Sequence, residues 1–293
     1  MCLIDRVGCK VMQYTKETGI TMRKMDFKFL EDNIELVVVK DQPTLSALLL
    51  GTSMFLKYLE PYLIKNMKKA VRRVEDPQLK EEMQAFCAQE TEHFQQHERF
   101  NGLVRNATAA KKEVLAYEAL IDAEYRYWTA AHSLEWNIAY AEGFEAMTCA
   151  LARSLFDLRT LDDSTPEFAE LMGWHLIEEI EHRSVAFDAY KAIGHGYFYR
   201  VGMSIYAQYH FLKTVWVLGH LTLSKDEELK KRYSGWKARI KNFTGLTKVL
   251  ALTVGRTLLS YSPFYHPKKI KINYRVIEEG KKYTEQSLEH KVV

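Results

Sequence analysis

The scarcity of proline and glycine most constrains the fold of this chain. Between Gln78 and Ser262 the only proline is Pro166, and a proline inside a helix would remove a hydrogen bond and clash with the preceding turn. Fourteen glycines and six prolines make up about 7% of the 293 residues, below the usual share of about 12%. An all-β fold needs frequent turns, which this composition does not supply. The sequence therefore predicts an all-α protein with long helices.

Apolar residues recur at three- and four-residue steps over five long stretches, which is typical of amphipathic helices. Asp76-Pro77 and Ser164-Thr165-Pro166-Glu167 are typical helix starts, with a capping side chain before a proline. We expect an N-terminal extension over residues 1–40, a helical bundle over residues 41–193 and further C-terminal helices over residues 194–293. The four predicted core helices of the bundle span about 45–74, 77–104, 134–156 and 164–192. A connector between the second and the third contains a further helix at about 111–131, and two or three C-terminal helices follow, for example at about 203–223 and 245–260.

The small net charge of +3, from 41 basic and 38 acidic residues, argues against a nucleic-acid partner. The charge is unevenly distributed, because residues 225–293 hold 16 basic and 7 acidic residues and are rich in aromatics. This composition is compatible with peripheral membrane contact, although a solvated basic surface is the more common explanation. Association with a second copy of the chain, as a homodimer, is a further possibility.

The cysteines and the apolar runs bear on the compartment. The four cysteines form no Cys-x-x-Cys pair, so neither a disulfide framework nor a zinc knuckle is expected. Charged residues interrupt the N-terminus before a signal-peptide apolar region can form. The longest uncharged runs, such as 44–56 and 201–212, are shorter than the roughly 18 residues of a membrane span. We therefore expect a cytoplasmic protein.

Three ionisable residues, Glu90, His93 and His97, interrupt the apolar stripe of the second predicted helix. An isolated charge in such a stripe would cost several kcal/mol of desolvation, so these groups must be paired or must bind a metal. The Glu90-x-x-His93 spacing places a carboxylate and an imidazole one turn apart on one helix face. Both side chains can therefore hold the same ion.

The fourth bundle helix repeats this motif as Glu179-x-x-His182, with His175 one turn earlier. A four-helix dinuclear site needs one further glutamate from each of the other two helices. Glu60 lies in phase with the apolar stripe of the first helix and Glu142 with that of the third, while Glu145, one turn later, is an alternative to Glu142. The layout predicts a dinuclear metal site, and a buried salt-bridge network is the alternative.

The roles of the residues around these motifs stay open. His97 and His175 either bind a metal, hold a carboxylate ligand in place by hydrogen bonding, or are core histidines whose hydrogen bonds are satisfied elsewhere. Glu178 and Asp188 are candidate catalytic acids or bases, and Asp188 is also a candidate partner for a ligating imidazole. The predicted metal ligands are Glu60, Glu90, His93, His97, Glu142, His175, Glu179 and His182.

Three segments of the chain resemble a known family. They are AFCAQETEHFQQHERFN (85–101), YAEGFEAMTCALA (140–152) and WHLIEEIEHRSVAFDAY (174–190). The resemblance is to the bacterial predicted metal-dependent hydrolases, an all-helical group with ferritin-like metal ligation, and it covers roughly residues 42–206. It implies a ferritin-like four-helix core, with metal ligands at Glu90, His93, His97, His175, Glu179 and His182.

The predicted ligands, carboxylates with imidazoles, suit two divalent metal ions, with iron as the first choice and manganese or zinc as alternatives. Our leading hypothesis is a di-iron enzyme that uses O2 and an electron donor to oxidise an apolar or aromatic small molecule, because the helix layout resembles di-iron oxidases. The alternative is a hydrolase that uses a metal-bound hydroxide, with Glu178 or Asp188 as base. A non-catalytic metal-binding bundle is the third hypothesis.

Overall fold

The computed structural model describes residues 19–29 and 34–289, so most of the predicted N-terminal extension lies outside the described residues. Within this part of the chain every regular element is a helix, as predicted. The one β-type contact among the described residues is an isolated bridge between Val39 and Ser164. The fold is therefore all-α.

Ten α-helices and two short 3-10 helices follow one another along the described chain. They are α2 (Pro43–Ala70), α3 (Pro77–Ala107), α4 (Lys111–Ala131), α5 (Leu134–Asp157), η1 (Thr160–Asp163), α6 (Pro166–Glu181), α7 (Val185–Ile193), α8 (Tyr197–Ser224), α9 (Glu227–Arg232), α10 (Trp236–Leu259), η2 (Pro267–Lys269) and α11 (Tyr274–Glu289).

Local capping explains where several of these helices begin. The Asp76 carboxylate accepts hydrogen bonds from the backbone N–H groups of Gln78 and Leu79, and Pro77 occupies the first helical position. The Ser133 hydroxyl accepts a hydrogen bond from the Trp136 N–H in the same way at the start of α5. These signals lie within a few residues of sequence, which is why the predicted starts of α3 and α5 agree with the structure.

The predicted fourth bundle helix is wrong in one respect, because it is two helices rather than one. Helix α6 ends at Glu181, and α7 begins at Val185. His182 caps α6 with a backbone outside the helical region, and the Arg183 guanidinium donates to the carbonyls of Ile180 and Pro267. A contact with residue 267 thus stabilises a break that the local sequence does not signal.

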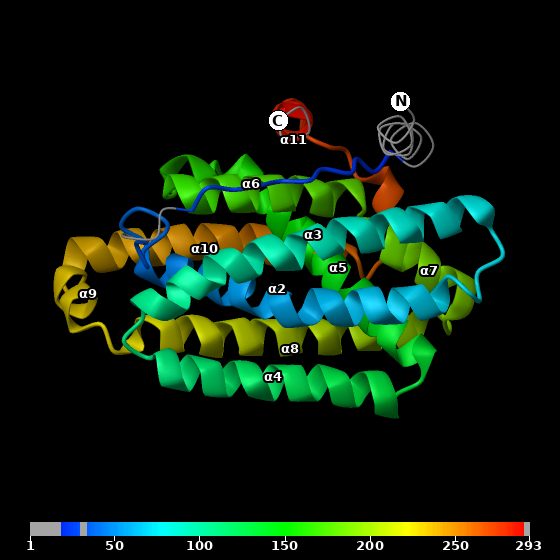
Figure 1. Cartoon of the computed structure of the whole chain (residues 1–293), viewed down its shortest axis with the longest axis horizontal. Helices are drawn as coiled ribbons and strands as arrows, with labels where there is room; N and C mark the ends of the chain where they lie inside the picture. The colour runs from blue at the N-terminus through cyan, green and yellow to red at the C-terminus, as the bar shows by residue number, and fades with distance from the viewer. Residues whose placement is uncertain (1–18, 30–33, 290–293) are drawn as a thin grey trace, which may run out of the picture.

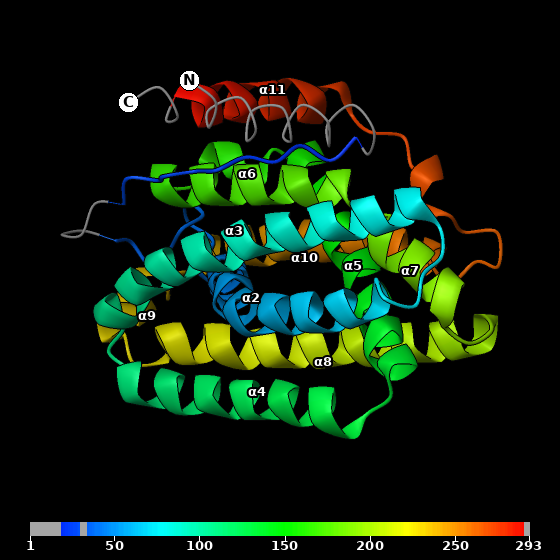
Figure 2. The same ribbon diagram turned by 45° about the vertical axis from the view of Figure 1, so that its right-hand side comes forward.

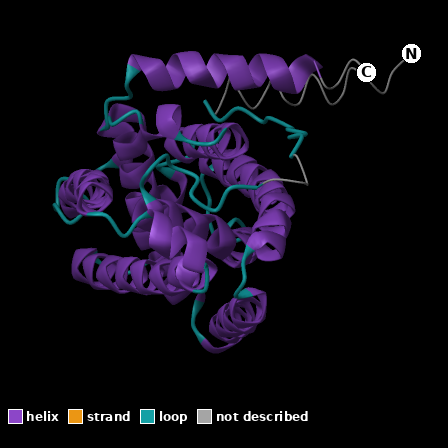
Figure 3. Cartoon of the chain, turned by 90° about the vertical axis from the view of Figure 1, so that its left-hand side faces the viewer, coloured by secondary structure: helices purple, strands orange, loops and turns teal. Residues whose placement is uncertain are grey.

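The long helices α2, α3, α6 and α8 lie nearly side by side (Figures 1 and 2). Helix α4 lies along one edge of the bundle beside α8, and α11 lies next to α6 at the opposite edge. Figure 3 views the bundle helices close to end-on and shows α11, which leads to the C mark, lying across them. Helices α8 and α10 both pack against α2 and α5.

Glycine permits close contact between α5 and α8. A Cβ atom at Gly143 would lie 2.4 Å from the Cα of Ser204, closer than real Cβ contacts. The Gln208 side-chain amide donates to the Gly143 carbonyl at the same crossing. Helix α8 therefore passes directly over the residues that precede and follow Gly143, which decides the surroundings of Glu142.

The segment at residues 19–29 packs between α6 and α11. The Arg23 side chain donates to Glu178 and Glu181 on α6 and to Thr284 on α11, and the Lys24 N–H donates to Ser287. None of the described helices combines the length and the apolarity needed to cross a bilayer.

Candidate metal centre

Four helices direct acids and imidazoles into one buried region. Helix α2 contributes Glu60, α3 contributes Glu90 and His93, and α5 contributes Glu145. Helix α6 contributes His175 and Glu179, and His182 follows directly after it. Each of these residues is at most 2% exposed. Such burial is unusual for charged groups and requires compensation.

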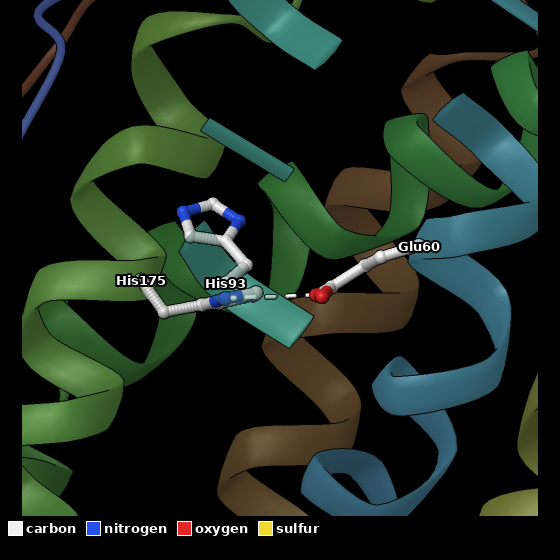
Figure 4. A group of neighbouring side chains, drawn as sticks. All are labelled: Glu60, His93 and His175. Atoms are coloured by element: carbon white, nitrogen blue, oxygen red, sulfur yellow. Dashed lines mark ion pairs between the residues drawn. The ribbon is translucent and has the colours of Figure 1, made fainter. Parts of the chain in front are cut away.

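One half of the region contains Glu60, His93 and His175, whose ligand atoms all lie within 4.8 Å of one another. Figure 4 shows Glu60 reaching from α2 toward the two imidazoles. The Nδ1 atom of His175 lies 3.8 Å from Oε1 of Glu60. The three groups surround a space that a cation can share.

The other half contains Glu90, Glu179 and His182, again with ligand atoms within 4.8 Å. The Nε2 atom of His182 lies 3.4 Å from Oε1 of Glu90, 3.6 Å from Oε2 of Glu179 and 3.4 Å from Oε2 of Glu145. Glu145 therefore belongs to this half. The two halves adjoin, since Nδ1 of His93 lies 3.7 Å from Oε2 of Glu90.

Many polar atoms of this region have no hydrogen-bond partner among the described residues. They include both carboxylate oxygens of Glu60, Glu90 and Glu145, together with Nδ1 of His93 and Nε2 of His182. A buried polar atom without a partner costs about 1–3 kcal/mol, and more when it is charged. Divalent metal ions would satisfy these atoms, and a donor set of carboxylates and imidazoles suits iron, manganese or zinc.

The pKa values show how strongly these groups interact. Burial raises the pKa of Glu145 to about 8 and raises that of Glu60 well above its usual value, with Glu90 and Glu179 adding to the effect on Glu60. Burial opposes a charged His93, but the hydrogen bond to Glu178 and the nearby charge of Glu90 outweigh it and raise the pKa of His93 to about 9. Without an ion, the region therefore holds protons at neutral pH.

A network on the outer side of His93 fixes the orientation of its ring. The Nε2 atom of His93 lies 3.0 Å from Oε2 of Glu178, whose Oε1 accepts from the Trp174 indole N–H at 2.9 Å and from Arg23 at 3.1 Å. This arrangement leaves Nδ1 of His93 free to face the cluster. The structure thus places Glu178 behind a ligand, where it holds the imidazole rather than facing a substrate.

His182 is held in a similar way. Its Nδ1 atom lies 2.9 Å from the side-chain oxygen of Gln89, and the amide of Gln89 donates to the Thr21 carbonyl and to Glu181. The Nε2 atom of His182 therefore points at the carboxylates. Arg23 and Gln89 are functional candidates that sequence reasoning missed, because Arg23 lies in the presumed extension and an uncharged glutamine gives no metal signal.

His97 contacts His175 rather than a carboxylate of the cluster. Its Nε2 atom lies 3.2 Å from Nδ1 of His175, and its Nδ1 atom lies 2.8 Å from the Ser53 hydroxyl, which donates to Asn101. Burial lowers the pKa of His97 to about 3, so its ring is neutral. The geometry assigns His97 to holding His175 in place.

Glu142 lies outside the cluster, in contrast to its predicted place among the ligands. Its two oxygens accept hydrogen bonds from the Arg200 guanidinium and the Ser204 hydroxyl, both at 2.9 Å, because α8 crosses α5 at Gly143. Burial raises the pKa of Glu142, and the contacts with Arg200 and Ser204 oppose that rise. The alternative, Glu145, occupies the predicted position.

Asp188 also lies apart from the cluster. It is on α7 and forms ion pairs with Lys268 at 3.1 Å and with His266 at 3.6 Å. Neither partner is one of the clustered imidazoles. The structure therefore gives Asp188 a role in anchoring the segment at η2 (Pro267–Lys269) to α7.

The comparison with known proteins agrees with this geometry. The sequence pattern of the predicted metal-dependent hydrolases matches residues 21–271. No match was found among curated proteins or among solved structures. The family description overturns our leading hypothesis of an O2-dependent di-iron oxidase and agrees with the hydrolytic alternative. The sequence match together with the clustered metal-ligand side chains establishes that this chain belongs to the family of predicted metal-dependent hydrolases.

Proposed function

We propose that the protein is a hydrolase with a dinuclear metal centre in a ferritin-like four-helix core. Glu60, His93 and His175 hold one ion, and Glu90, Glu179, His182 and Glu145 hold the other. The observation that carries this proposal is the convergence of unpartnered carboxylate oxygens and imidazole nitrogens from four helices on one buried region. Two adjoining groups of ligands argue for two ions rather than one.

When bound, the ions supply Lewis-acid chemistry that acidifies water and polarises the bond to be hydrolysed. The residues of the chain do the remaining work. Glu178 and Gln89 orient the imidazoles of His93 and His182 through the nitrogens that face away from the cluster. The helices exclude bulk water, which strengthens electrostatic interactions inside the site. Glu178 already contacts three polar partners, so we do not assign it the role of base.

A hollow at the surface lies beside α5. It measures about 200 Å³ and is lined by Ala146 and Cys149, which neighbour Glu145 in sequence, and by Arg153, Arg256 and Lys269. Arg256 pairs with Asp157, whereas Arg153 forms no ion pair among the described residues. We assign this hollow to a small-molecule substrate that carries an anionic group beside an ester or amide bond.

The test uses full-length protein stripped with a chelator and reloaded anaerobically with zinc, manganese or ferrous iron. We expect metal-dependent hydrolysis of carboxylate-bearing aryl esters or amides without O2. The variant Arg153→Gln should raise KM for the anionic substrate and leave KM for a neutral analogue unchanged. Two loaded ions without any turnover would favour the non-catalytic bundle, and turnover only in the presence of O2 would refute the hydrolytic proposal.

A further inference from the structure

Helix α10 presents an apolar stripe to solvent on a side that the other described helices leave uncovered. Its buried residues are Val249, Thr253 and Thr257, and they line the side that packs against the bundle. The exposed apolar side chains recur at helical spacing on another side of the helix. They are Trp236, Ile240, Phe243, Val254 and Leu258. Trp236 is 68% exposed and Phe243 is 65% exposed.

Helix α8 carries a second stripe of the same kind. Its exposed members are Phe198, Ile205, Tyr209, Leu212 and Trp216, again at steps of three, four or seven residues. Phe198 is 85% exposed and Trp216 is 53% exposed. Soluble proteins usually scatter exposed apolar residues singly, so a stripe of large ones marks an interaction surface.

The two helices belong to one side of the molecule. Both pack against α2 and α5. At the end of α10, the carbonyl of Ser260 accepts a hydrogen bond from Arg200 near the start of α8, and the hydroxyl of Tyr261 donates to Gln208. At the other end, Asn242 of α10 contacts Thr44 of α2, and the Thr44 side chain lines a hollow together with Trp216.

The basic character of these helices indicates an anionic partner. Neither α8 nor α10 contains an aspartate or a glutamate, whereas α10 carries five basic residues. Lys237, Lys241 and Lys248 lie at helical spacing beside the apolar stripe. Lys241 pairs with Asp41, and Lys237 and Lys248 form no ion pair with another described residue. Aromatic side chains flanked by lysines are typical of helices that lie on anionic membranes.

We propose that α8 and α10 form a docking face for the surface of an anionic phospholipid bilayer. The apolar stripes enter the boundary between headgroups and acyl chains, and the lysines contact lipid phosphates. A second copy of the chain fits this face less well. A twofold contact uses the same patch on both copies and would bring the lysines of one copy toward those of the other.

The test is co-sedimentation of the full-length, metal-loaded protein with phosphatidylcholine vesicles that contain 30% phosphatidylglycerol, compared with pure phosphatidylcholine. We expect binding to the anionic vesicles that weakens at high salt. Tryptophan emission should shift to shorter wavelength on binding, because Trp216 and Trp236 leave water.

Matched variants separate the apolar contribution from the charge contribution. Each lysine near an anionic surface contributes about a fivefold gain in affinity, so Lys237→Glu with Lys248→Glu should weaken binding by about twentyfold or more. Lys65→Glu with Lys191→Glu changes the net charge equally on exposed positions of α2 and α7 and should have a smaller effect. Ile240→Ser with Phe243→Ser should also abolish binding.

Three results would overturn the proposal. The first is no binding of the wild-type protein to either vesicle. The second is an equal loss of binding in the Lys65→Glu, Lys191→Glu control, which would indicate a response to net charge alone. The third is a concentration-dependent dimer in light scattering that Ile240→Ser with Phe243→Ser dissolves, without vesicle binding. All substituted side chains are exposed, and circular dichroism should show unchanged melting.

Discussion

The exchange of roles between Glu142 and Glu145 makes a sharp prediction, because the two acids lie on the same helix and both are buried. Glu142→Gln removes the counter-charge of Arg200, whose side chain is also buried. Arg200 retains a hydrogen bond to the Ser260 carbonyl and lies 5.5–5.7 Å from three aromatic ring centres. Breaking a buried ion pair costs about 3–5 kcal/mol, and the remaining contacts of Arg200 favour the lower end, about 3 kcal/mol.

This loss converts into a measurable melting shift. For 293 residues, an unfolding entropy of about 2.1 cal/mol/K per residue gives about 0.6 kcal/mol/K, so 3 kcal/mol lowers Tm by about 5 °C. Metal stoichiometry should not change. Glu145→Gln should lower the metal stoichiometry and leave Tm nearly unchanged. The substitution removes a ligand, and it replaces a carboxylate whose pKa is raised to about 8 by burial. Its ion-free form should melt within about 2 °C of the wild type.

The assay is thermal unfolding of chelator-stripped protein by circular dichroism, combined with elemental analysis of the same samples after reloading with metal. The two substituted positions lie three residues apart on the same helix, and both variants carry the same change from glutamate to glutamine. Each variant is therefore the control of the other. If Glu142→Gln lost metal and kept its Tm while Glu145→Gln kept full loading, the assignment of the two acids would be refuted.

Three other predictions address the network, the protons and the helix crossing. Glu178→Ala should weaken metal affinity about 10–100-fold, because the His93 ring loses the hydrogen bond that orients it. The number of ions bound at saturation should not change. Unchanged affinity in a metal titration would contradict the positioning role of Glu178. Because the pKa values of Glu145 and His93 are raised to about 8 and about 9, both hold protons at pH 7 and release them on coordination. Weakly buffered protein should therefore release about one proton or more for each metal ion that binds. Metal affinity should rise with pH. Metal binding without proton release would contradict the protonated state of these two residues. Gly143→Ala should lower the free energy of unfolding in urea by about 2 kcal/mol. Gly102→Ala should not lower it, because the space around Gly102 is open. Equal stability of the two variants would contradict the close crossing of α5 and α8.

Much of the fold was readable from local sequence, because capping and periodicity act within one or two helical turns. The predicted helix at residues 111–131 agrees with α4 at both ends, and the predicted start at Pro77 agrees with α3. The Glu-x-x-His spacing places a carboxylate and an imidazole on one face of any helix that contains it. Local sequence therefore predicted the helices and the repeated motif, whereas the family match agrees with the hydrolytic alternative rather than with the leading oxidase hypothesis.

Only the tertiary structure decided which residues meet. Glu142 and Glu145 lie less than one helical turn apart, so periodicity cannot separate them, and the approach of α8 at Gly143 directs Glu142 to Arg200. The Arg23 guanidinium reaches Glu178 across 155 positions of sequence, and no local pattern encodes such a contact. Helical spacing determines which side chains share a face, whereas the packing of other helices determines what that face meets.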